Sequence, residues 1–115
     1  MDIFDEDIFD DDLYKLVVTI VQRGYSDEVV FAGKSAGAKG AVILQGKGAG
    51  SSERKFFGFR IEPENEVVMM LVKEELVVPI MKAIYAVTDY KSSARGMVFA
   101  LPVSYVTGMT HIKED

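Results

Sequence analysis

Two strand-length segments of this sequence are apolar on both faces, and this pattern limits the folds open to the chain. Residues 13–21, LYKLVVTIV, are rich in β-branched side chains, as strands are. Residues 66–72, EVVMMLV, form a second segment of this kind. A sheet that is covered on one side only would alternate apolar with polar residues. Both faces of the predicted sheet must therefore be covered.

The segments between these strands carry helix and strand signals in a regular order. We expect a helix over residues 26–38, with Ser26 as its N-cap and Gly40 as its stop. A strand, AVIL, begins at residue 41 and ends near residue 45. A second helix begins at about residue 76, since Pro79 is tolerated only in a first turn. The last strand is MVFALPV, residues 97–103.

The predicted order is β-α-β-β-α-β, which is the ferredoxin-like plan of the α+β class. This plan packs two helices against one face of a four-stranded antiparallel sheet. Two helices cannot cover both faces, and an exposed apolar face of this size would aggregate. We therefore expect the second face to be buried by self-association, in a homo-oligomer.

Charge separates the first twelve residues from the rest of the chain. Residues 1–12, MDIFDEDIFDDD, hold seven of the eighteen acidic residues, and the remaining chain has a formal charge of +2. Dense like charges resist folding, so we expect a disordered acidic leader over 1–12. An acidic-hydrophobic recognition segment, marked by the repeated DIFD, is the alternative. One folded domain over 13–110 and a polar tail over 111–115 complete the organisation.

Residues suited to catalysis or metal binding are scarce. The sequence has no cysteine and one histidine, His111, which excludes thiolate metal sites and Cys-His dyads. Glu62, Glu64 and Glu66 flank a proline and an asparagine, and we interpret them as a solvated turn. We expect neither an enzyme nor a metal site. Apolar runs too short to span a bilayer, and an acidic first segment, predict a cytoplasmic protein without membrane insertion.

Two short motifs resemble nucleotide or nucleic-acid sites. The tripeptide GKS at 33–35 lacks the earlier glycine of a P-loop, because Glu28 stands at that position. KFFGFRI, residues 55–61, approximates the RNP1 motif of RRM domains, whose strand order is the same. Glu62 replaces its final aromatic residue, and a near-neutral body attracts phosphates poorly. RNA binding is an alternative, and we expect no nucleic-acid partner.

The segment GAVILQGKGAG, residues 40–50, leaves two interpretations open. Gly46, Gly48 and Gly50 alternate, and Lys47 stands among them. Such a loop turns backbone N–H groups toward an anion, and the lysine adds positive charge. A flexible hairpin connection would have the same sequence.

Residues 13–109 resemble the PII nitrogen-regulator family, in its divergent PII-like branch. The resemblance rests on LVVTIVQRGYSDEVVFAGKSAGAKGAVILQGKGAG, on IEPENEVVMMLV and on RGMVFALPVSYV. It implies a ferredoxin-like domain, assembled as a trimer whose sheets face inward. It also implies adenine-nucleotide sites between subunits, and a long T-loop through which the protein regulates a partner, such as a membrane transporter or an enzyme.

The resemblance assigns the T-loop to about 46–62 and the nucleotide-gripping B-loop to about 89–96. The ligand-binding residues that it implies are Gly46, Lys47, Gly48, Gly50, Lys91, Arg95 and Gly96. Met97 replaces the family's phosphate-binding lysine, Glu64 replaces a second lysine, and Gly50 replaces the glutamine that helps to bind 2-oxoglutarate with magnesium. These changes favour ADP or AMP over Mg-ATP with 2-oxoglutarate.

The sequence thus predicts a homotrimeric PII-like signalling protein that senses a small anionic effector. A metal-responsive trimer like the CutA group is a further alternative, against which the single histidine and the absent cysteines argue.

Overall fold

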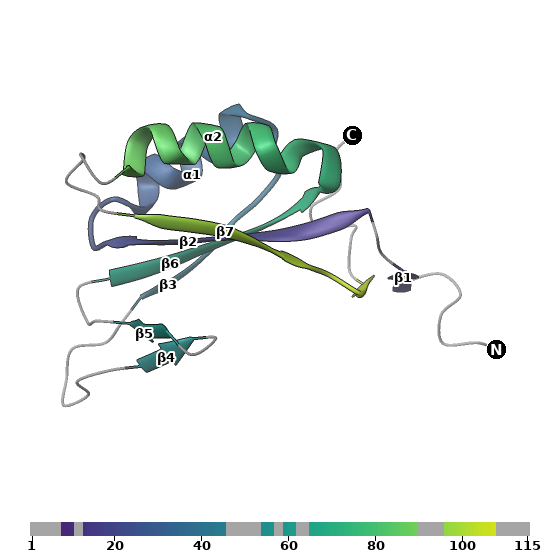
Figure 1. Cartoon of the computed structure of the whole chain (residues 1–115), viewed down its shortest axis with the longest axis horizontal. Helices are drawn as coiled ribbons and strands as arrows, with labels where there is room; N and C mark the ends of the chain where they lie inside the picture. The colour runs from purple at the N-terminus through teal and green to yellow at the C-terminus, as the bar shows by residue number, and fades with distance from the viewer. Residues whose placement is uncertain are drawn as a thin grey trace.

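A four-stranded antiparallel sheet forms the centre of the domain (Figure 1). The computed structural model describes residues 8–10, 13–45, 54–56, 59–61, 65–89 and 96–107. The strands lie in the order β3-β6-β2-β7. Their bounds are β2 Tyr14–Gln22, β3 Val42–Gln45, β6 Asn65–Lys73 and β7 Met97–Pro102. β2 pairs with β6 on one side and β7 on the other, which leaves β3 and β7 at the sheet edges.

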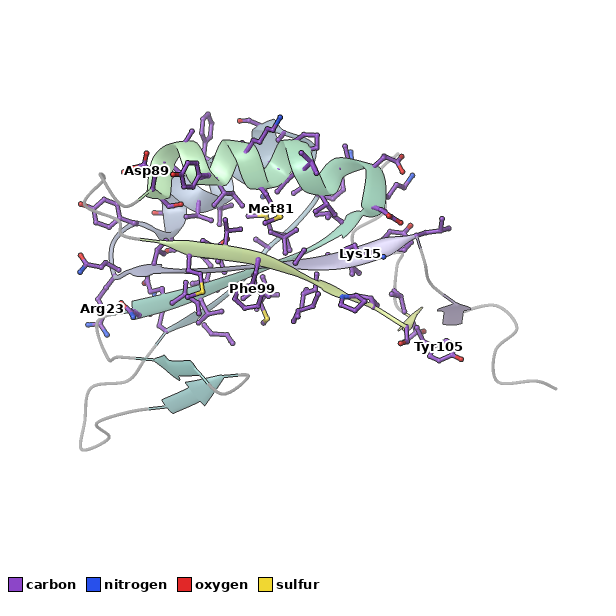
Figure 2. The ribbon with its side chains drawn as sticks, in the orientation of Figure 1. Lys15, Arg23, Met81, Asp89, Phe99 and Tyr105 are labelled. Atoms are coloured by element: carbon purple, nitrogen blue, oxygen red, sulfur yellow. The ribbon has the colours of Figure 1, made fainter. Side chains whose placement is uncertain are left out.

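Two helices cover one face of this sheet, as the sequence predicts (Figure 1). They are α1, Ser26–Ser35, and α2, Val77–Thr88, which follows the short 3₁₀ turn η1, Glu74–Leu76. Figure 2 shows Met81 directed from α2 toward the sheet. The buried residues of this core are Val17, Val21, Val29, Ala32, Ala38, Val68, Met70, Val72, Ile80 and Ile84. Their burial supplies the main driving force for folding of the single chain.

The opposite face of the sheet is apolar too, which confirms the prediction that the strands are apolar on both faces. Val18, Ile20 and Val67 are buried there, and Leu16, Met69, Phe99 and Leu101 pack against them half-buried. Phe99 projects from β7 on the side away from the helices (Figure 2). The ferredoxin-like arrangement of two helices on one face is therefore correct, and its second face carries a continuous apolar layer.

Helix α1 differs from its prediction at both ends. Its N-cap is Tyr25, whose carbonyl accepts the Val29 N–H at 3.2 Å, and Ser26 is the first helical residue. The helix ends at Ser35 because Gly37 takes a φ of 122°, which L-residues with a side chain avoid. The N–H groups of residues 37 and 38 then bond the carbonyls of residues 34 and 33, as in a Schellman motif.

Helix α2 and the last strand agree with their predictions. Pro79 lies in the first turn of α2, where its missing N–H has no intrahelical partner to lose. β7 ends at Pro102, which fits a residue that cannot donate to a further ladder.

Two small two-stranded sheets accompany the central one, and the sequence-based order lacks both. β4, Arg54–Phe56, pairs with β5, Phe59–Ile61, as a separate hairpin. β1, Ile8–Asp10, pairs with β8, Tyr105–Thr107. These three residues of β1 are therefore paired strand within the segment 1–12 that the sequence predicts as a disordered leader. The rest of that segment, and the tail over 111–115, lie outside the described residues.

Candidate functional site

One row across the sheet brings several chain segments to the same end of the domain. Gln45 pairs with Glu66, and Glu66 pairs with Val21. Gly96 comes next, since Met97 pairs with Ile20 and a Cβ on Gly96 would lie 2.8 Å from Cγ1 of Val21. The row therefore joins both stems of the segment 46–64, the exit of β2 and Gly96, the residue that follows the segment 90–95.

The turn from β2 into α1 closes this end of the sheet. The Tyr25 N–H donates to the Gln22 carbonyl at 3.2 Å. Gly24 takes a φ of 98°, and a Cβ built there has no atom within 4 Å, so conformation rather than space explains the glycine. Arg23 precedes it and is exposed. The turn thus places a cationic side chain beside the loop stems.

Glu66 is the buried polar centre of the row. Its side chain is 3% exposed. Oε1 accepts the Gly24 backbone N–H at 3.2 Å, and Oε2 accepts Nε2 of Gln45 at 2.7 Å. The solvated turn predicted for Glu66 is therefore wrong. Its position, alternating with buried Val68 and Met70 on the helix-covered face, is the sequence signal that identifies it.

The C-terminal end of α2 packs directly against Gly96. The Gly96 N–H donates to the Thr88 carbonyl at 2.7 Å. A Cβ on Gly96 would lie 2.6 Å from the Thr88 Cβ, which is closer than such atoms approach. The Thr88 hydroxyl in turn donates to the Ile84 carbonyl at 2.8 Å. The packing alone therefore demands a glycine at position 96.

Charged side chains from two loops lie at this end of the domain. Figure 2 shows Arg23 and Asp89 at the same end of the domain, and Lys15 and Tyr105 at the other. Asp89 is the C-cap of α2. Arg23, Gln45 and Glu66 are candidate site residues that the sequence interpretation missed.

Of the residues predicted to bind the ligand, Gly96 lies in the row described above. Gly46, Lys47, Gly48, Gly50, Lys91 and Arg95 lie outside the described residues. Gln45, the last described residue of β3, directly precedes Gly46, and Gly96 directly follows Arg95.

The segment KFFGFRI does not have the place that RNP1 has in an RRM domain. β4 and β5 pair with each other, in a two-stranded sheet apart from the central one. An RRM instead presents its stacking aromatics on the main four-stranded sheet. Within the described part of the chain, no three His, Cys, Asp or Glu side chains group in a way that would hold a metal ion.

The fold and this row define a class: a ferredoxin-like domain with a long insertion that leaves and rejoins one end of its sheet. A family model described as "Nitrogen regulatory protein P-II" matches residues 14–111. The chain belongs to the P-II family, as its sequence resemblance implies. A search of curated protein sequences gives no match.

Several solved structures share this fold at low sequence identity. CPII of Thiomonas intermedia, bound to ADP and bicarbonate, is 17% identical with a TM-score of 0.63, over 92% of this chain and 97% of that one. A protein of Thermus thermophilus described as PII-like is 23% identical with a TM-score of 0.59, over 94% and 100%. Arabidopsis thaliana PII bound to citrate is 22% identical with a TM-score of 0.56, over 82% and 78%.

In the part of the chain that the structure describes, no helix has the length and hydropathy needed to cross a membrane.

Proposed function

We propose that this chain is a PII-like signalling protein that binds an adenine nucleotide between subunits and regulates a protein partner through its loop over about 46–62. The observation that carries the proposal is the row Gln45–Glu66–Val21–Gly96. It brings the roots of the two segments that the family resemblance assigns to ligand binding to one end of the sheet. Among the structural relatives, CPII of Thiomonas intermedia binds ADP, AMP and acetate in one structure, which supports this ligand class.

The proposed binding residues are Gly46, Lys47, Gly48, Gly50, Lys91, Arg95 and Gly96. Alternating glycines provide backbone N–H groups for phosphate oxygens, and Lys47, Lys91 and Arg95 provide positive charge. Arg23 adds a further cation at the same end of the sheet. The buried carboxylate of Glu66 adds a negative charge near the loop stems. This balance favours ADP or AMP over a triphosphate with magnesium and 2-oxoglutarate.

The assembly that we propose is a homotrimer with the helix-free sheet faces turned inward. Every strand of the central sheet contributes apolar side chains to that face, and the edge residues Val42, Leu44 and Met97 are 54%, 44% and 46% exposed in the single chain. Apolar area of this extent stabilises an assembly when it is removed from water. A site between subunits would then form where the sheet edges of two chains meet.

The proposal includes no catalytic role, because the family acts by signalling and the sequence offers few catalytic groups. The cytoplasmic location of the protein and the identity of its partner remain predictions from the sequence.

Calorimetry on the purified protein tests the ligand proposal. We expect ADP and AMP to bind, and ATP to bind more weakly. Lys47→Ala and Arg95→Ala should each weaken ADP binding by about tenfold or more, since a charge-assisted hydrogen bond contributes roughly 1.5–3 kcal/mol. Lys73→Ala is the matched control, because Lys73 ends β6 about 23 Å from Glu66 along the strand.

Two results would contradict the proposal. The absence of heat with all three nucleotides rejects the adenine-nucleotide ligand. A monomer in light scattering at micromolar concentration rejects the trimer, and with it a site between subunits.

A further inference from the structure

We propose that Glu66 is a positioning residue, which fastens both stems of the segment 46–64 to the turn between β2 and α1. The ligand-related part of this inference rests on the proposed function. Glu66 does not contact the nucleotide in this scheme. Glu66 holds the stems in the orientation in which the neighbouring residues bind the nucleotide. A shift of the turn is therefore coupled to a shift of the stems.

The geometry joins three segments at one side chain. Gln45 is the last residue of β3 and Glu66 is the second residue of β6, and the two are paired across the strands. The Glu66 carboxylate therefore holds its own stem and the opposite stem together through the 2.7 Å bond to Gln45 Nε2. Its other oxygen reaches Gly24, which lies 42 positions away in sequence.

The chemistry of the carboxylate makes this contact specific. An ionised carboxylate only accepts hydrogen bonds, and here two uncharged N–H donors occupy its two oxygens. A side chain that is 3% exposed cannot exchange these donors for bulk water without opening the structure. A glutamine at this position would have one accepting oxygen, so its NH₂ group would need an accepting oxygen on residue 45.

The backbone conformation at Gly24 gives the turn a defined orientation relative to Glu66. Gly24 has a φ of 98° and donates its N–H to Oε1 of Glu66, and the next N–H closes the turn on Gln22. A substitution by any L-residue would strain this conformation. The orientation of the turn is therefore transmitted to both loop stems through one side chain.

A swap of donor and acceptor tests the inference. Glu66→Leu has a similar volume and removes both acceptors, and in Gln45→Glu two carboxylates face each other. In the double variant Q45E/E66Q the new carboxylate at position 45 accepts from the new amide at position 66. The oxygen of that amide then accepts the Gly24 N–H, so both bonds are restored with the charge moved to the opposite strand.

The first measurement is amide hydrogen exchange by NMR, which needs no ligand. We expect the Gly24 amide to exchange about tenfold faster in E66L, the effect of losing one hydrogen bond to a charged acceptor. In Q45E/E66Q most of this protection should return, because a neutral amide oxygen at residue 66 again accepts the Gly24 N–H. The second measurement is ADP affinity by calorimetry, at a temperature where circular dichroism shows all variants folded. We expect about tenfold weaker binding in E66L and recovery in the double variant.

The outcomes separate this inference from the proposed function. Unchanged Gly24 exchange in E66L, or a double variant that behaves like E66L in exchange, overturns the fastening role. Restored exchange without restored ADP affinity overturns the link to the ligand. If the wild-type protein binds no nucleotide, the proposed function fails, while the exchange measurements still decide the role of Glu66.

Discussion

Thr19→Val should stabilise the domain, because the Thr19 hydroxyl is buried without a hydrogen-bond partner among the described residues. Thr19 is 0% exposed on the helix-covered face of β2. It stands opposite Val68 on β6 and Val98 on β7, so its surroundings are apolar. Valine has nearly the same shape and replaces the hydroxyl by a methyl group. The change therefore removes a polar group that gains nothing from burial.

The magnitude follows from the desolvation of the hydroxyl. Burial of an unsatisfied polar group costs about 1–3 kcal/mol, and a buried methyl group adds a small favourable contribution. We expect the free energy of unfolding to rise by about 1–2 kcal/mol. For a domain of this size, each kcal/mol raises the melting temperature by roughly 4 °C.

Thr88→Val is the matched control. Thr88 is 1% exposed, and its hydroxyl donates to the Ile84 carbonyl at 2.8 Å. The same chemical change there removes a made hydrogen bond and should destabilise by about 0.5–1.5 kcal/mol. The two valine variants should thus move in opposite directions.

Urea denaturation of wild type and both variants, followed by circular dichroism, measures these changes. All three are compared at one protein concentration, because self-association makes the midpoint depend on concentration. A Thr19→Val variant that is less stable than wild type would refute the reasoning, since its hydroxyl would then be satisfied.

Two further predictions test packing and surface charge. Gly96→Ala should lower the free energy of unfolding by about 1–3 kcal/mol in urea denaturation, because the new Cβ overlaps Thr88 and Val21; an unchanged midpoint would contradict the close packing. Glu74→Gln should change stability by less than about 1 kcal/mol, because its 3.8 Å ion pair with Lys15 joins side chains that are 63% and 25% exposed. A larger loss in the same assay would show that this pair is coupled to other groups.

The sequence predicts the elements of this fold because their signals are local. The two-faced apolar strands, the proline in the first turn of α2 and the Pro102 stop each depend on neighbouring residues. The end of α1 is harder to predict, because more than one glycine near it could terminate the helix. Gly37 rather than Gly40 ends the helix, and a Cβ at Gly37 would lie 3.2 Å from the side chain of Leu76. That contact depends on tertiary packing.

The candidate site, too, could be predicted from the sequence only in part. The glycine-rich segment and the family resemblance are visible in the sequence, and they predict which residues bind the ligand. The period of β6 directs Glu66 to the same face as Val68 and Met70, but its partners are not visible in the sequence, because they lie 21 and 42 positions away. A carboxylate in an acidic, turn-like segment is usually solvated, and the tertiary structure brings hydrogen-bond donors to this one.

By itself, then, the sequence determined the element order, the apolar character of both sheet faces and the family. The hydrophobic period and the effects of proline and glycine act over a few residues, so they can be recognised in the sequence alone. The tertiary structure decided which residues meet at the end of the sheet, and it buried Glu66 between Gly24 and Gln45. A buried charge is tolerated only where distant segments bring donors to it, and here the strand register and the turn between β2 and α1 do so together.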